Sequence, residues 1–335
     1  MTVRIFLSFL LCLCSGVSSD CFAEKGGLLG TSLPGKYRPF SDDSPWNMLI
    51  GDAPVISPHS KAMIRHLSRK TGHIKGSMIH WTVPLFVIDA SRSPLRTVYT
   101  KEPLHPGMDP DKLSRIPNVP IPDGVWPDPK KDGHMLLVDP VQSISWDFSR
   151  AKLLPDGNWQ ATRVEKWDLT DSGCRKPFAG KRWWTFGARG SGMPLIAGLI
   201  RPEEIETGEI RHALVCATPV NRNAKKSGNK ELCSPVASRT DGKLDGTDTI
   251  PMGARLQLDP SLDIEDLQLS PETKIIARAM QRYGLYVGDG SPTFNLYFQN
   301  LGHNKGRWRS ISDFTDLRKI PIDKFRVLDC KIIKK

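Results

Sequence analysis

The sequence predicts a mostly β fold, a jelly-roll or concanavalin-like β-sandwich with a few short helices. Three observations support this prediction: the strand-like runs are short, Gly and Pro punctuate them, and helix signals occur in only three segments. The composition excludes a disordered chain, because 39% of the 335 residues are hydrophobic and the 28 Gly and 27 Pro residues are too few for low complexity. This length permits one or two domains.

The N-terminal segment predicts export. Arg4 precedes an apolar run and then small residues that suit a signal peptidase. We therefore expect residues 1–23 to be a signal peptide, 24–45 to be an extended N-terminal arm, and 46–335 to form a single β-rich domain that is periplasmic or secreted. The apolar run is shorter than the ~20 residues that a membrane span needs, and no later stretch qualifies.

Three segments carry helix signals. The first covers 57–70, with Ser57 as N-cap, Pro at the first helical position and an apolar stripe on one face. The second covers 201–208, with Pro at its start, acids in its first turn and Gly at its end. The third covers 270–283, where Ser270 is the expected N-cap.

The strand-like runs are rich in β-branched and aromatic residues and are separated by turn residues. Between two of them, residues 102–131 form a connection with eight prolines, a length typical of functional or disordered loops. The predicted strands lie at 80–90, 97–101, 134–139, 143–153, 158–169, 209–219, 254–259, 285–289, 293–301 and 324–330.

Cysteine usage agrees with an oxidising compartment. Four cysteines follow the predicted signal peptide, and an even number suggests two disulfides with three possible connectivities. We favour Cys216 with Cys233, because a strand end and a polar loop lie between them, which leaves Cys174 to pair with Cys330. No CxxC or HxxxH spacing occurs, so we predict neither a metal site nor a cofactor.

Several motifs resemble a largely uncharacterised family of secreted bacterial proteins with a concanavalin/jelly-roll-like β-sandwich. The resemblance spans roughly residues 45–330 and implies an architecture often found in polysaccharide-active enzymes and lectin-like modules. It implies no catalytic residue. The motifs are Trp46-Asn47, Asp132-Gly133-His134, the run 191–201, the run 208–214 and Gln281-Arg282-Tyr283-Gly284.

One catalytic hypothesis is hydrolysis of a glycosidic bond, which needs a pair of carboxyl groups. The strand at 143–153 alternates apolar and polar residues, so Asp147 is expected on an outward face that forms the floor of a sugar cleft. Asp139 ends the neighbouring strand and His134 opens it, and both join the candidates. The alternative is that Asp147 is a solvated strand residue and Asp139 a turn residue.

A second hypothesis is β-elimination on a uronic acid chain, which needs a base and a group that neutralises the carboxylate. His212 and Tyr283 are candidate bases, and Arg189, in a glycine-rich loop, is the candidate neutralising group. His212 alternates with apolar residues, so a buried, hydrogen-bonded histidine is the alternative.

Aromatic and charge content favour a sugar partner. Trp126, Trp183 and Trp184 fall in expected loops, where indole faces stack on sugar rings, although tryptophans that anchor loops are the commoner case. The net charge of +11 suits an acidic polysaccharide or an anionic envelope surface, while no motif favours nucleic acid. We therefore expect a secreted protein that cleaves a polysaccharide, or a non-catalytic carbohydrate-binding or envelope-associated protein of the same fold. The oligomeric state stays open.

Overall fold

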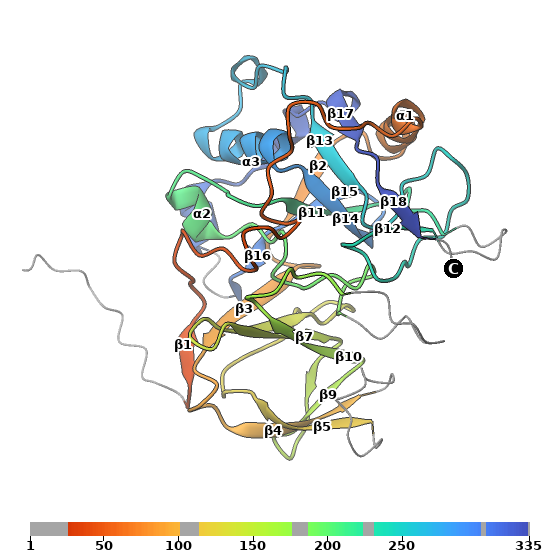
Figure 1. Cartoon of the computed structure of the whole chain (residues 1–335). Coiled ribbons are helices and arrows are strands. Elements are labelled where there is room, and N and C mark those ends of the chain that lie inside the picture. The colour runs from red at the N-terminus through yellow and green to blue at the C-terminus, as the bar shows by residue number, and fades with distance from the viewer. Residues whose placement is uncertain (1–25, 101–113, 176–186, 224–230, 303–305, 334–335) are drawn as a thin grey trace, which may run out of the picture.

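The computed structural model describes residues 26–100, 114–175, 187–223, 231–302 and 306–333, and mixed β-sheets form most of its regular structure (Figure 1). Two six-stranded sheets lie one above the other in this view. A four-stranded sheet lies below them, and α1 (Ser60–Thr71) and α3 (Pro271–Arg282) lie at the opposite end. The predicted signal peptide, residues 1–23, lies outside the described residues.

The first large sheet, called sheet 1, lies in the middle of the molecule and is buried on both faces. Leu136 and Val138 belong to one hydrophobic cluster, while Met135 and Leu137 on the other face belong to a second cluster. Strands buried on both faces read as continuous apolar runs. Sheet 1 has the order β1 (Leu28–Gly30), β3 (Val83–Ile88), β6 (Met135–Asp139), β7 (Ile144–Ser149) and β10 (Arg163–Asp168), and β16 (Gln299–Asn300) also pairs with β3.

The second large sheet, called sheet 2, brings two strand ends to one edge. Strands β11 and β14 are parallel neighbours, so Thr218 and Gly290 at their carboxyl ends lie side by side. Sheet 2 has the order β17 (Phe325–Val327), β13 (Arg255–Leu258), β14 (Leu285–Gly290), β11 (Leu214–Thr218), β15 (Phe294–Tyr297) and β2 (Ile74–Ser77).

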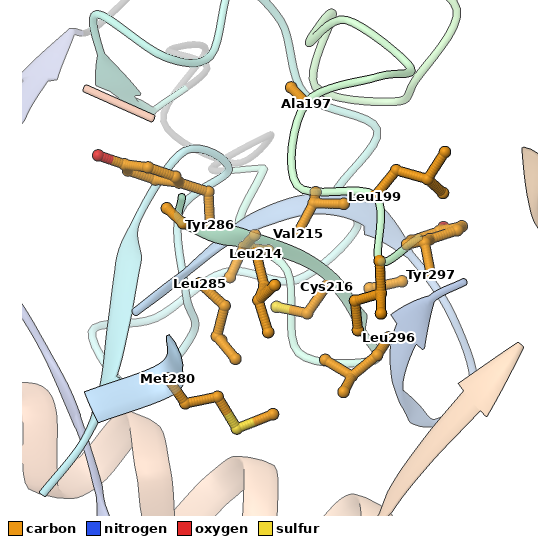
Figure 2. Packing of buried hydrophobic residues seen from close by; sticks show 14 of the residues in the cluster. Ala197, Leu199, Leu214, Val215, Cys216, Met280, Leu285, Tyr286, Leu296 and Tyr297 are labelled. Atoms are coloured by element: carbon orange, nitrogen blue, oxygen red, sulfur yellow. The ribbon is translucent and has the colours of Figure 1, made fainter. Parts of the chain in front are cut away.

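Helices complete the core around sheet 2. Figure 2 shows Leu214, Cys216, Leu285 and Leu296 of the central strands packed near Met280 of α3. Helix α3 begins after Ser270, whose hydroxyl accepts a hydrogen bond from the Thr273 amide as an N-cap. The α-helices are α1 (Ser60–Thr71), α2 (Pro202–Glu206), α3 (Pro271–Arg282) and α4 (Gly306–Ile311), and short 3-10 turns lie at Glu265–Leu267, Thr315–Lys319 and Ile322–Lys324.

The smaller sheets correct one interpretation of the sequence. Part of the Pro-rich connection forms a strand, β5 (Arg115–Pro120), because its prolines lie at positions that an edge strand tolerates. The four-stranded sheet has the order β5, β4 (Leu95–Thr100), β9 (Trp159–Ala161) and β8 (Lys152–Leu153), and β12 (Leu232–Ser234) pairs with β18 (Lys331–Ile333).

The predicted mostly β class is confirmed, and every predicted strand overlaps an observed one. The jelly-roll connectivity is not confirmed, because both large sheets contain parallel as well as antiparallel pairs. The N-cap predicted at Ser57 is wrong, since α1 begins at Ser60 after His59. Residues 26–45 have little regular structure beyond β1, but they pack onto the core through Leu33 and Phe40.

The disulfide prediction is wrong in its pairing. Cys233 bonds to Cys330, with 5.6 Å between their Cα atoms, while Cys216 and Cys174 are free thiols. The antiparallel pairing of β12 with β18 brings Cys233 to the C-terminal segment. Cys216 instead lies fully buried in β11, a central strand, and the polar loop that follows β11 does not bring Cys233 next to Cys216.

We expect Cys330→Ser to lower the free energy of unfolding by about 2–5 kcal/mol, because the disulfide closes a long loop and restricts the unfolded chain. The two cysteines are 97 residues apart. Urea unfolding without reductant measures the change. Cys174→Ser, at a half-buried free thiol, is the control and should change little; equal stability of the two variants would contradict the prediction.

Within the described residues, no helix combines the length and apolar character needed to cross a bilayer.

Candidate active site

A polar cavity of about 370 Å³ lies between sheet 1 and the carboxyl edge of sheet 2. Sheet 1 contributes residues around the start of β6 and the end of β7, and sheet 2 contributes the ends of β14 and β15. A neighbouring cavity of about 390 Å³ shares Asp241 and Gly290 with it. The side chains that give the first cavity its chemistry are Asp132, His134, Arg150, Arg163, Arg239, Asp241, Asp289 and Tyr297.

Asp289, at the end of β14, is the most strongly hydrogen-bonded acid of the cavity. Its Oδ2 accepts from Arg189 Nη1 at 3.1 Å and from the Tyr297 hydroxyl at 3.1 Å. Its Oδ1 accepts from the backbone amide of Gly190. Donors and a guanidinium on a carboxylate stabilise its ionised form and fix its orientation.

Arg189 is fully buried behind Asp289 and is held on every side. Its Nη2 donates to the Leu195 carbonyl at 3.1 Å, and its guanidinium lies 4.4 Å from the centroid of the Tyr297 ring. The adjacent loop is also fixed, because Arg239 Nε donates to the Arg189 carbonyl at 3.0 Å. The positive charge beside Asp289 is therefore part of a rigid wall.

Asp241 lies at the rim of the cavity beside Asp289. The residue as a whole is exposed, but its carboxylate packs against two glycines, and a Cβ atom at Gly190 would lie 2.3 Å from Asp241 Oδ2. A side chain at Gly190 would therefore displace the carboxylate. Loss of water around this carboxylate, reinforced by the charge of Asp289, raises the pKa of Asp241 to about 6.

Asp132 and His134 form the opposite wall of the cavity. Burial lowers the pKa of His134, so the imidazole is neutral at pH 7, and its Nδ1 has no hydrogen-bond partner among the described residues. Desolvation raises the pKa of Asp132, and the charge of Asp289 adds to this effect. The cavity thus combines a carboxylate held by three donors, two acids with raised pKa values and a neutral histidine.

Two predicted site residues belong to this cavity, His134 as a lining residue and Arg189 as the support of Asp289. Asp139 does not. Its carboxylate accepts from the amides of Ala90, Val141 and Gln142, so it stabilises a turn, as the alternative interpretation held.

The expectation that Asp147 faces outward is wrong. The residue has no exposed surface, and its Oδ2 accepts from Trp167 Nε1 at 2.9 Å and from the Leu195 amide at 2.6 Å. The physical reason is that sheet 1 is covered on both faces. Asp147 lies opposite Leu136, and Asp139 lies opposite Ile144. The two acids are thus on opposite faces of the sheet and cannot act as a pair.

Asp147 instead forms a buried acid pair with Glu165, its direct partner across β7 and β10. Each has one carboxyl oxygen without a partner among the described residues. Burial raises the pKa of Asp147 to about 7. Burial also raises the pKa of Glu165 to about 7; the charge of Asp147 adds to this increase, while the charge of Arg175 reduces it. The pair is therefore protonated below neutral pH.

This acid pair predicts a pH-dependent stability. Between about pH 4 and pH 7 the unfolded chain loses these protons while the folded chain keeps them, so the free energy of unfolding should fall as the pH rises. In Asp147→Asn, roughly 3 kcal/mol of this fall in the free energy of unfolding should disappear, because the amide is neutral and donates toward Glu165. Urea unfolding at several pH values tests this. Asp168→Asn, at an exposed acid of β10, is the control; an unchanged slope in Asp147→Asn would contradict the prediction.

His212 lies in the core, away from the cavity lining, as its alternative interpretation held. Its Nε2 lies 2.8 Å from Glu204 Oε1 and its Nδ1 lies 2.9 Å from the Ala213 carbonyl. Both partners are hydrogen-bond acceptors, so the ring is placed to donate to either of them. Arg201 Nη2 also donates to Glu204 Oε1, at 2.7 Å. One buried carboxylate therefore holds a buried guanidinium and a buried imidazole.

The remaining predicted residues do not line the cavity either. Tyr283 is buried at the end of α3, where its carbonyl accepts from Arg255. Trp126 is half-buried and packs edge-on against Phe86, with ring centroids 5.4 Å apart. Trp183 and Trp184 lie outside the described residues. In the part of the chain that the structure describes, no cluster of three or more His, Cys, Asp or Glu residues is arranged to hold a metal ion.

Sequence reasoning missed Asp241, Asp289 and Tyr297. A signal existed for the two acids, since each directly precedes a glycine, as Asp132 does. The chain has six Asp-Gly pairs, and this pair is common in turns, so the signal alone does not separate a site from a turn.

Comparisons of the chain with family models, curated proteins and solved structures found no match.

Proposed function

We propose that the protein hydrolyses glycosidic bonds of a polysaccharide in this cavity. One observation carries the proposal: two neighbouring carboxyl groups lie in opposed environments. Asp289 is stabilised as the anion by Arg189, Tyr297 and Gly190, while Asp241 beside it has a pKa raised to about 6. An acid that keeps its proton, beside a carboxylate that donors hold in place, is what acid–base cleavage of an acetal requires.

The chemistry follows from these two states. Protonated Asp241 gives its proton to the leaving oxygen as the bond from that oxygen to the anomeric carbon breaks. Asp289 either takes a proton from the attacking water or attacks the carbon itself before water releases the sugar. Its rigid donors hold it in place during the reaction. The stereochemistry of the product, followed by NMR, distinguishes the two routes.

A polysaccharide substrate is supported by the polar lining and by the arginines at the cavity. Arg150, Arg163 and Arg239 suit sugar hydroxyls and carboxylates, which accept hydrogen bonds. We include export in the same proposal, because the disulfide suits an oxidising compartment. We also propose a sandwich-like arrangement, because sheet 1 and sheet 2 share one hydrophobic cluster.

The test is a screen of neutral and uronate-bearing polysaccharides with the wild-type protein and Asp289→Asn. New reducing ends that depend on Asp289 and carry no unsaturated product support hydrolysis. Glycan binding without cleavage in the wild type would overturn the proposal and favour the non-catalytic binder.

The raised pKa of Asp241 predicts the pH profile of cleavage. Activity should decline above about pH 6, because Asp241 loses the proton that it must donate. Initial rates from pH 4 to 9 measure this limb. Asp241→Asn should no longer show the decline in activity above about pH 6. It should also cleave substrates with good leaving groups much better than natural glycans. If activity of Asp241→Asn declines above pH 6 as in the wild type, Asp241 is not the proton donor. Asp132 is then the next candidate.

A second candidate reaction, β-elimination, rests on His134. A neutral imidazole with an unpartnered nitrogen beside arginines suits removal of the proton next to a uronate carboxylate. This reaction produces an unsaturated sugar, which absorbs in the ultraviolet. Ultraviolet-absorbing products that vanish in His134→Ala would favour elimination over hydrolysis.

A further inference from the structure

A groove of about 780 Å³ is lined by α1 and by the segment that leads into β17. Helix α1 lies at the upper right of Figure 1. Exposed Lys61, Arg65 and Arg69 line the groove from the helix, and Arg326 lines it from β17. Asp323 is the one acid among the described residues that line it, so these side chains carry a net charge of +3. By the same count the described lining of the candidate active site has no net charge, because it contains three arginines and three aspartates.

The three cations of α1 repeat every four residues and lie along one stripe of the helix. Like charges at this spacing destabilise a helix by about 0.2–0.5 kcal/mol per pair. Lys61 also lies in the first turn, where the helix dipole favours acids, and that turn has none. The stripe thus opposes helix stability.

No acid in α1 itself offsets this cost. Residues 53–88 contain no Asp or Glu. Among the described residues, no ion pair involves Lys61, Arg65 or Arg69, whereas His66 on the same helix pairs with Asp248. A sequence that keeps such a local conflict is expected to use it for a function.

We infer that this basic groove binds a linear anionic polysaccharide at a site separate from the catalytic cavity. Charge complementarity favours a chain of regularly spaced anions, because successive cations of the stripe are about 6 Å apart along the helix axis. The lining also includes exposed Ile56 and Pro58, whose apolar surfaces suit the C–H faces of sugar rings.

Other polyanions fit the groove less well. A bilayer surface is flat and does not enter a concave groove. Grooves for single-stranded nucleic acid combine cations with aromatic side chains on which bases stack, and Phe325, the one aromatic among the described lining residues, is buried. An acidic peptide remains as the competing ligand, and the test includes it.

The test measures binding of a fluorescent decagalacturonate by fluorescence anisotropy, in the Asp289→Asn background so that cleavage does not consume the probe. Arg65→Gln with Arg69→Gln should weaken binding about tenfold, because two charge contacts are lost. Lys70→Gln with Lys75→Gln is the matched control, since it removes two exposed charges close by but outside the groove lining, and it should change the affinity less than twofold. The fully methyl-esterified probe should not bind.

Three results would overturn the inference. Equal weakening in the two double variants would mean that net charge alone attracts the probe. Unchanged binding in Arg65→Gln with Arg69→Gln would place the polysaccharide elsewhere. Tighter binding of decaglutamate than of decagalacturonate, lost in the same variant, would assign the groove to an acidic peptide. Electrophoresis of the probe after each measurement shows whether it is intact, so the outcome is independent of whether hydrolysis or elimination is the correct reaction.

Discussion

Asp289→Asn is expected to lower glycan cleavage by about a thousandfold or more, because the amide can neither accept a proton from water nor attack the anomeric carbon. The substitution also leaves Arg189 without its carboxylate in a fully buried position. Initial rates on the best substrate of the screen, with reducing ends as the readout, measure the effect.

The control for this prediction is Asp329→Asn, at an exposed acid outside the cavity lining, which should keep full activity. Circular dichroism and a melting curve must show that Asp289→Asn is folded, because removal of a buried charge partner destabilises a protein. A folded Asp289→Asn protein with wild-type rates would refute the assigned role of Asp289.

Glu204→Gln is expected to lower the free energy of unfolding by about 3–5 kcal/mol, because it leaves the buried Arg201 guanidinium without its anion. Arg201 and His212 both bond to Glu204 Oε1, and the side chains of all three residues are buried. Urea unfolding at pH 7 measures the loss. Glu206→Gln, at an exposed ion pair with Arg307 on the same short helix, is the matched control and should cost less than about 1 kcal/mol.

The pH dependence of Glu204 gives a second readout of the same cluster. Burial alone would raise its pKa, but the charges of Arg201 and His212 and their hydrogen bonds lower it to about 2. The stabilisation is therefore complete above the ordinary glutamate pKa of 4.5 and is lost as the pH falls toward 2. Similar unfolding energies for Glu204→Gln and Glu206→Gln at pH 7 would contradict the proposed cluster.

The secondary structure was largely predictable because its signals are local. Ser270 and Pro271 determine the start of α3, and alternating or continuous apolar runs locate the strands. The sheet order was not predictable, because parallel pairs such as β3 with β6 join strands about fifty residues apart. The error at Cys216 has the same origin, since it assumed that neighbours in the sequence are neighbours in space.

The candidate site was predictable only in part. His134 and Arg189 stood out by residue type and by a glycine-rich context. Asp241 and Asp289 acquire their properties from packing, because Gly190 and Gly290 bring two acids from distant segments together. The prediction that Asp147 faces outward was wrong for a related reason, because alternation along a strand does not reveal that both faces of the sheet are covered. The resemblance to secreted bacterial proteins stays a prediction.

The shared lining of the two cavities has a consequence for the products. Asp241 and Gly290 border both cavities, so space for sugar units exists on both sides of the proposed proton donor. Under the proposed function, a polymer lies across Asp241 and is cut in its interior, not trimmed from an end. The viscosity of the solution should then fall early in the reaction, and fragments of mixed length should precede single sugars.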